Sequence, residues 1–121
     1  MGAGLIRKRV VEKFGYLFDQ DYFIYAEDFD LGLRIRLIGM KTIIVRRAKC
    51  YHMHSLTMKR YSTPARNTYL LERNLLTTFF KIFSAKTVTV YMPYVLGFRI
   101  LSIAKDLLQL KIKNAWSRVM A

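Results

Sequence analysis

The chain has 121 residues, a formal net charge of +13 and a hydrophobic content of 53%. This length allows one small domain or a part of a larger one, and the apolar content excludes an intrinsically disordered chain. The single cysteine, Cys50, excludes an intrachain disulfide and a thiolate metal cluster, and we expect it to be a buried apolar residue of a strand.

The charge is distributed unevenly along the chain. Residues 1–30 contain four basic and six acidic residues, whereas residues 31–121 contain seventeen basic and two acidic ones. The second part therefore predicts an anionic partner, which can be a membrane surface, a nucleic acid or a phosphorylated substrate. Aromatic and aliphatic residues alternate with the basic ones, which slightly favours the membrane surface. A nucleic acid is the less favoured partner, because no signature of a nucleic-acid-binding fold is present.

The first elements are short. Residues 2–6 are small and apolar and begin as if in the middle of a strand, which indicates a missing neighbour. Residues 10–14 predict a helical turn that ends at Gly15. Residues 16–25 then form a loop rich in aromatic side chains.

A longer helix and a strand follow this loop. The helix begins with Asp28 as its N-cap, continues for about three turns and ends at Gly39. Residues 42–45 predict a buried strand, which continues in extended form to His52 and His54. The period of two in a strand places both histidines on one face.

The rest of the chain predicts basic amphipathic helices. Residues 62–64, Ser-Thr-Pro, are a strong helix start, and the helix that follows has an apolar stripe opposite a basic face. Pro93 opens another helix, which runs to about Leu110, and Trp116 lies in a basic tail. The longest uncharged apolar window, residues 87–98, is shorter than the roughly 20 residues of a spanning helix, so we expect these helices to lie on a membrane.

Carboxylates and imidazoles form the chain's most plausible site. Glu27, Asp28 and Asp30 lie at a helix start, where the helix dipole stabilises negative charge, and such residues commonly act only as caps. A charged carboxylate there can also serve as a general base that takes a proton from a hydroxyl group. His52 and His54 can be core histidines or can bind a divalent metal.

Other catalytic motifs are missing from the sequence. The Asp-x-Asp segments at residues 19–21 and 28–30 lie in a loop and at a helix start, whereas a motif that binds a metal diphosphate is expected at the end of an apolar strand. The chain has no Gly-rich phosphate loop, no Ser/His/Asp arrangement and no Cys/His nucleophile pair.

Several spaced motifs resemble the acceptor-side, C-terminal portion of a family 2 glycosyltransferase of the rhamnosyltransferase-like kind. The resemblance runs without a gap from residue 2 to about residue 62, and its motifs are residues 2–8, 14–19, 23–34, 39 and 51–55. It implies an inverting transfer of a sugar from a nucleotide-diphosphate sugar to a hydroxyl acceptor, on an α/β, Rossmann-like GT-A fold. The acceptor would be lipid-linked or part of a polysaccharide.

The resemblance also implies residue roles. Asp28 would be the catalytic base of the family's Glu-Asp pair, and Glu27 would border the acceptor pocket. His52 would join the family's Asp-x-Asp in holding Mg²⁺ or Mn²⁺ against the diphosphate, where the metal neutralises the leaving group. Asp30, Arg34 and His54 would support the site.

We therefore expect residues 1–62 to form a partial GT-A domain that lacks its nucleotide-binding half, and residues 63–121 to form membrane-surface helices. The missing half, with its Asp-x-Asp, would precede residue 2 or come from a separate chain, so we do not expect the isolated chain to transfer sugar. The expected location is cytoplasmic, on the inner face of the cell membrane. The alternative is a non-catalytic basic module that binds an anionic membrane surface or nucleic acid.

Overall fold

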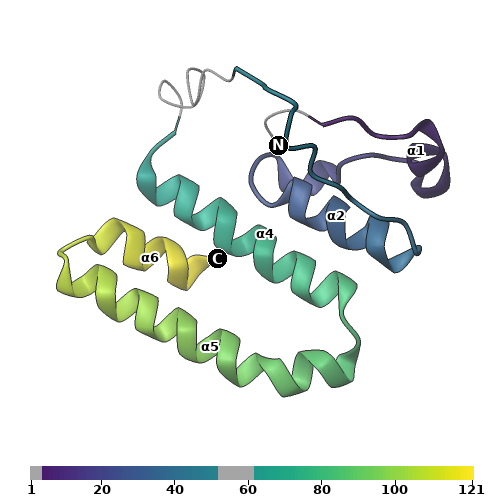
Figure 1. Cartoon of the computed structure of the whole chain (residues 1–121). Helices are drawn as coiled ribbons and strands as arrows, with labels where there is room; N and C mark the ends of the chain where they lie inside the picture. Colours follow the sequence, from purple (N-terminus) through teal and green to yellow (C-terminus); the bar gives the residue numbers. More distant parts are fainter. Residues whose placement is uncertain (1–3, 52–61) are drawn as a thin grey trace. The chain divides into compact units, whose positions relative to one another are not determined.

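The computed structural model describes residues 4–51 and 62–121, and the chain divides into two compact units (Figure 1). The N-terminal unit comprises residues 1–60 and the C-terminal unit residues 61–121. All regular secondary structure in the described residues is helical.

The N-terminal unit is built from α1 (Lys8–Phe14), the short 3₁₀-helix η1 (Gln20–Tyr22) and α2 (Glu27–Leu37). Helix α1 ends as predicted at Gly15, whose φ of 74° is a left-handed conformation that glycine adopts without a steric penalty. The unit has a small apolar core in which the buried side chains of Val10, Leu31 and Ile35 pack together. Partly buried apolar residues surround these three: Ile6, Phe14, Leu17 and Met40.

Helix α2 begins two residues earlier than the sequence predicts. Its N-cap is Ala26, so Asp28 lies inside the first turn and the prediction of Asp28 as the N-cap is wrong. The end of the helix agrees with the prediction, since Leu37 is its last residue and Gly39 follows with a φ of 75°.

The predicted α/β fold is wrong for the described part of the chain, which contains no strand and no sheet. Residues 42–45 were expected to form a buried strand, but Ile43 and Ile44 are 82% and 93% exposed. A strand is stable only when a neighbouring strand accepts its backbone hydrogen bonds, and the described residues supply none. A turn at residues 46–47 follows, in which the backbone N–H of Ala48 donates to the carbonyl oxygen of Val45, so the predicted extended run to His52 is interrupted. Cys50, beyond this turn, is exposed and not buried as predicted.

The C-terminal unit consists of α4 (Pro64–Ile82), α5 (Ala85–Leu108) and α6 (Ile112–Met120). The predicted start of α4 is confirmed, because the Thr63 side chain accepts a hydrogen bond of 3.2 Å from the backbone N–H of Arg66. The predicted start of the next helix is wrong: α5 begins at Ala85 behind the cap Ser84 and contains Pro93 in its interior. The basic tail around Trp116 is helical.

Helix α6 packs on both α4 and α5 (Figure 1). Four charged side chains join the three helices, and we call them the Glu72 cluster: Glu72 of α4, Arg99 and Asp106 of α5, and Arg118 of α6. The Arg118 Nε donates to Asp106 Oδ2 over 2.8 Å, and a second guanidinium nitrogen of Arg118 donates to Glu72. The Arg99 Nη1 lies 3.7 Å from Glu72 Oε2, so Glu72 bridges two arginines.

Candidate functional site

A strained turn precedes the carboxylates of α2. Phe23, Tyr25 and Ala26 have φ values of 51°, 69° and 62°, and none of these residues is glycine. Residues with a side chain adopt this region at a cost of order 1–3 kcal/mol each, and such strain is concentrated at functional sites. The turn therefore singles out the start of α2 as a candidate site.

The carboxylates at this helix start lie in different environments. Asp28 is exposed, and its Oδ1 accepts a hydrogen bond of 2.9 Å from the backbone N–H of Phe29. Glu27 is half-buried, and Asp30 is fully buried. Both Glu27 and Asp28 belong to the first turn of α2, where the helix dipole stabilises a negative charge. Asp28 is therefore the carboxylate of this group that a substrate can reach.

Asp30 and Arg34 form a buried ion pair on α2. The Arg34 Nε donates to Asp30 Oδ2 over 2.7 Å, and the two side chains are 8% and 0% exposed. The Tyr22 hydroxyl donates to the other carboxylate oxygen of Asp30 over 3.4 Å. Two of the three expected supporting residues, Asp30 and Arg34, are thus in direct contact with each other, and Asp30 also contacts η1.

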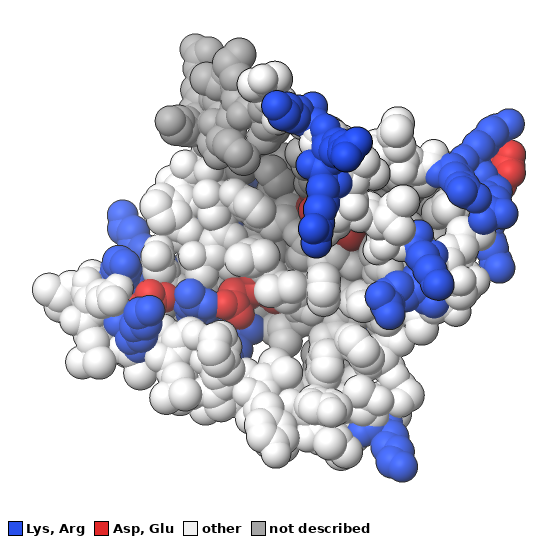
Figure 2. Space-filling view, in the orientation of Figure 1, with Lys and Arg blue, Asp and Glu red and all other residues white. Residues whose placement is uncertain are grey.

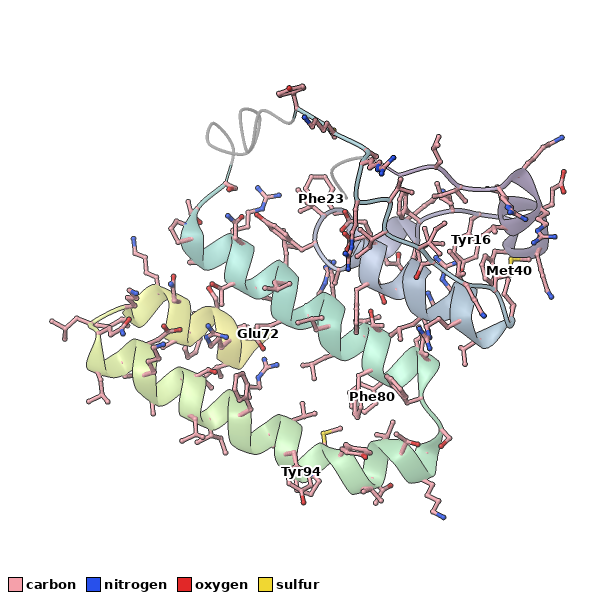
Figure 3. The ribbon with its side chains drawn as sticks, viewed as in Figure 1. Tyr16, Phe23, Met40, Glu72, Phe80 and Tyr94 are labelled. Carbon is pink, nitrogen blue, oxygen red and sulfur yellow. The ribbon has the colours of Figure 1, made fainter. Side chains whose placement is uncertain are left out.

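Arg34 also fixes the aromatic loop that leads to the strained turn. Its Nη2 donates to the carbonyl oxygen of Leu17 over 2.8 Å. Its guanidinium lies 4.9 Å from the ring centre of Phe14 and 4.8 Å from that of Tyr16, distances at which a cation is attracted to an aromatic face. Arg34 therefore connects α2, the end of α1 and the loop, of which Figure 3 labels Tyr16 and Phe23.

The predicted metal ligands fall in a different part of the chain. His52 and His54 lie outside the described residues. Among the residues that the structure describes, no three His, Cys, Asp or Glu side chains are arranged to hold a metal ion. The Mg²⁺ or Mn²⁺ that the resemblance implies stays a prediction, and we assign no chemical step to it.

The chain matches no protein-family model, no curated protein and no solved structure. The proposed kinship with glycosyltransferases therefore depends on the sequence motifs and on the geometry at the start of α2.

Sequence reasoning found the carboxylates and missed what surrounds them. The i, i+4 spacing of Asp30 and Arg34 is a signal for a helical ion pair, and it could have predicted their contact. The strained turn has no such signal, because residues 23–26 contain no glycine to mark a left-handed conformation. The contacts of Arg34 with Phe14 and Tyr16 are tertiary and leave no local pattern.

Proposed function

We propose that this chain is the acceptor-side portion of a glycosyltransferase that moves a sugar from a nucleotide-diphosphate sugar to a hydroxyl acceptor. The observation that carries the proposal is the exposed carboxylate of Asp28 on the first turn of α2, directly after a strained turn. The motifs around it resemble those of family 2 glycosyltransferases. The proposal concerns the activity only and does not include a sheet in the described residues.

Asp28 is the proposed general base. An acceptor hydroxyl is a weak nucleophile, and removal of its proton as the new glycosidic bond forms lowers the barrier to attack on the sugar. The C–O bond to the nucleotide diphosphate breaks in the same displacement, and the proton passes to the carboxylate. Glu27, the neighbouring half-buried carboxylate, is proposed to border the acceptor pocket.

The proposed acceptor is lipid-linked or part of a polysaccharide, and the proposed place of reaction is the inner surface of the cell membrane. The C-terminal unit supports this location, since residues 62–121 contain nine Lys or Arg residues and two acidic ones. Anionic lipid headgroups attract such a unit.

The test begins with the DNA upstream of the Met1 codon. A strand followed by Asp-x-Asp, in frame or behind one frameshift, would supply the nucleotide-binding segment, and the joined protein is then assayed for sugar transfer from nucleotide-diphosphate sugars. We expect Asp28→Asn to lower kcat by about 10²- to 10⁴-fold, the usual contribution of a general base.

Asp21→Asn is the matched control. It also removes one exposed carboxylate, from η1, and it lies in an Asp-x-Asp segment to which we assign no role in transfer. Equal losses in both variants would overturn the assignment of Asp28. An unrelated upstream sequence, together with unchanged sugar incorporation in membranes of cells that carry Asp28→Asn, would overturn the glycosyltransferase proposal.

The second candidate is a non-catalytic basic module that binds an anionic membrane surface. The large exposed apolar side chains of α5 and α6 favour it. A nucleic acid is the weaker partner for these helices, because its polar phosphates and base edges would not bury the exposed aliphatic side chains. Vesicle binding without any response to nucleotide sugars would favour this module.

A further inference from the structure

The second half of helix α5 has its polar and apolar faces reversed relative to a helix of a soluble protein. In the first half the less exposed face carries Val88, Met92 and Val95. In the second half it carries Arg99, Ser102 and Asp106 beside Ile103, and Arg99 and Asp106 belong to the Glu72 cluster. The outward face of α5 carries large apolar side chains that are 49–86% exposed: Val90, Tyr91, Tyr94, Leu96, Phe98, Ile100, Leu101, Leu107 and Leu108. Figure 3 shows Tyr94 pointing away from α6, whereas Glu72 of α4 points toward it.

Helix α6 has the same reversed arrangement. Ala115 is 3% exposed, and Arg118 points inward to Glu72 and Asp106. The outward residues follow an i, i+4, i+7, i+8 spacing and form one apolar stripe, with exposures of 56–65%: Ile112, Trp116, Val119 and Met120. Two neighbouring helices therefore direct charge inward and apolar surface outward.

The charge that remains on the surface of this unit is positive. Glu72 and Asp106 are the two acidic residues of residues 62–121, and Arg99 and Arg118 engage both of them. Lys86, near the start of α5, is exposed, and so are Lys105, Lys111 and Lys113, near its end. In Figure 2 the surface over α5 is largely white, and Lys or Arg side chains lie near its ends.

We propose that the C-terminal unit embeds the apolar faces of α5 and α6 in the acyl region of an anionic lipid bilayer, with the Glu72 cluster as its polar interior. Acyl chains cover the apolar surface, and the lysines reach the headgroups by extending their long side chains. A second copy of the chain fits less well, because a symmetric pair would bring the lysines of one copy close to those of the other. The inference deepens the membrane part of the proposed function and rests on it.

The helices lie in the plane of the membrane. Helix α5 is the helix of the described residues that is long and apolar enough to cross a membrane, and its 24 residues extend over about 36 Å. A spanning orientation would place Arg99 within the hydrocarbon core, which is about 30 Å thick, and would carry the attached Glu72 and Arg118 into it. An in-plane orientation leaves this cluster on the side of α5 that faces away from the lipid.

The experiment uses Trp116, the chain's single tryptophan, as a depth probe. The full chain is diluted from detergent into vesicles of phosphatidylcholine and phosphatidylglycerol whose acyl chains carry bromine, which quenches tryptophan fluorescence on contact. We expect a blue-shifted emission that loses most of its intensity. The proposal would be overturned if vesicles left the emission unchanged. It would also be overturned if the emission changed equally in concentrated protein without lipid, and that result would indicate self-association.

A pair of double variants tests the outward face. Phe98→Ser with Leu101→Ser removes two side chains that are 75% and 69% exposed, and we expect the vesicle partition coefficient to fall about 100-fold. Ile43→Ser with Ile44→Ser removes two side chains of the N-terminal unit that are even more exposed, at 82% and 93%, and should leave the partition coefficient within about twofold of the wild-type value. Circular dichroism checks that both variants remain helical, and equal effects in helical variants would overturn the assignment to α5.

Labelling from outside the vesicles distinguishes the two orientations. Single cysteines are placed at Thr87 and at Gln109, near the two ends of α5, in a Cys50→Ser background. An in-plane helix exposes both positions to a membrane-impermeant maleimide, and a spanning helix exposes one, which would contradict the in-plane orientation. None of these measurements depends on sugar transfer. A chain that embeds in vesicles although the joined protein transfers no sugar would therefore refute the enzymatic proposal alone.

Discussion

At the residue scale, Arg34 joins several elements around the candidate site. It pairs with Asp30, donates to the Leu17 carbonyl and lies against the rings of Phe14 and Tyr16. These contacts hold the loop around Tyr16 and Leu17. The chain continues from this loop into the strained turn before Asp28. The strain at Phe23, Tyr25 and Ala26 persists because the elements on both sides of the turn are fixed in this way.

We predict that Arg34→Met destabilises the N-terminal unit by about 3–5 kcal/mol, because it leaves the carboxylate of Asp30 buried without its cation. Hydrogen exchange of the α2 amides in the full chain measures the loss. Lys8→Met is the matched control, since it breaks an i, i+4 pair with Glu12 whose side chains are 91% and 59% exposed, and it should change the exchange little. Similar effects of the two substitutions would contradict the structural role of Arg34.

The residues of the site could be predicted from the sequence to different extents. Glu27 and Asp28 were predicted as the site from their density at a helix start, and the structure places Asp28 in solvent there. Asp30 was grouped with them, although its burial and its pairing with Arg34 separate it from Asp28. Burial depends on tertiary contacts, so a pattern of neighbouring carboxylates does not reveal which of them a substrate can reach.

At the element scale, the start of α4 depends on one hydroxyl group. Thr63 caps the helix, and Pro64 occupies its first position, where a missing N–H has no cost. The adjacent Ser62 offers the same hydroxyl chemistry one residue earlier.

We predict that Thr63→Ala destabilises α4 by about 1 kcal/mol, because the Arg66 amide loses its acceptor. Ser62→Ala should have little effect, and Thr63→Ser should retain most of the wild-type stability. Amide exchange in the first turn of α4 reports the difference. A larger effect of Ser62→Ala would show that the cap lies at the other hydroxyl.

Helices could be predicted from the sequence more reliably than strands. The start of α4 and the end of α1 each depend on a local signal, a hydroxyl cap or a glycine, that acts within one turn. Residues 42–45 have strand propensity, but a strand needs a partner distant in sequence, and propensity alone does not provide it. Pro93 misled the prediction because proline also occurs inside helices whose surroundings satisfy the freed backbone groups.

At the scale of the whole molecule, the two units carry different kinds of surface. The N-terminal unit has a small apolar core of the ordinary kind around Val10, Leu31 and Ile35. The C-terminal unit directs the Glu72 cluster inward and apolar side chains outward. The sequence predicted amphipathic helices, but the inward direction of the polar faces could not be read from helical periodicity, which is the same for either orientation.

We predict that replacing Lys105, Lys111 and Lys113 together by Gln weakens binding to anionic vesicles by about 100-fold, because each lysine near such a surface contributes about 1 kcal/mol. Binding of the wild-type chain should weaken with added salt, and that of the triple variant should depend less on salt. Flotation of the full chain with vesicles measures both effects, with Lys8→Gln in the N-terminal unit as the control. Unchanged affinity of the triple variant would exclude headgroup attraction.

The reversed polarity of the C-terminal unit also affects how the protein is made. A newly synthesised chain cannot bury the outward residues of α5 and α6 in water, whatever its degree of folding. Residues 1–60 leave the ribosome before residues 61–121 and contain the unit with a conventional core. If the proposed membrane embedding holds, we expect synthesis beside a membrane, or capture by a chaperone until a membrane is reached, to raise the yield of this protein.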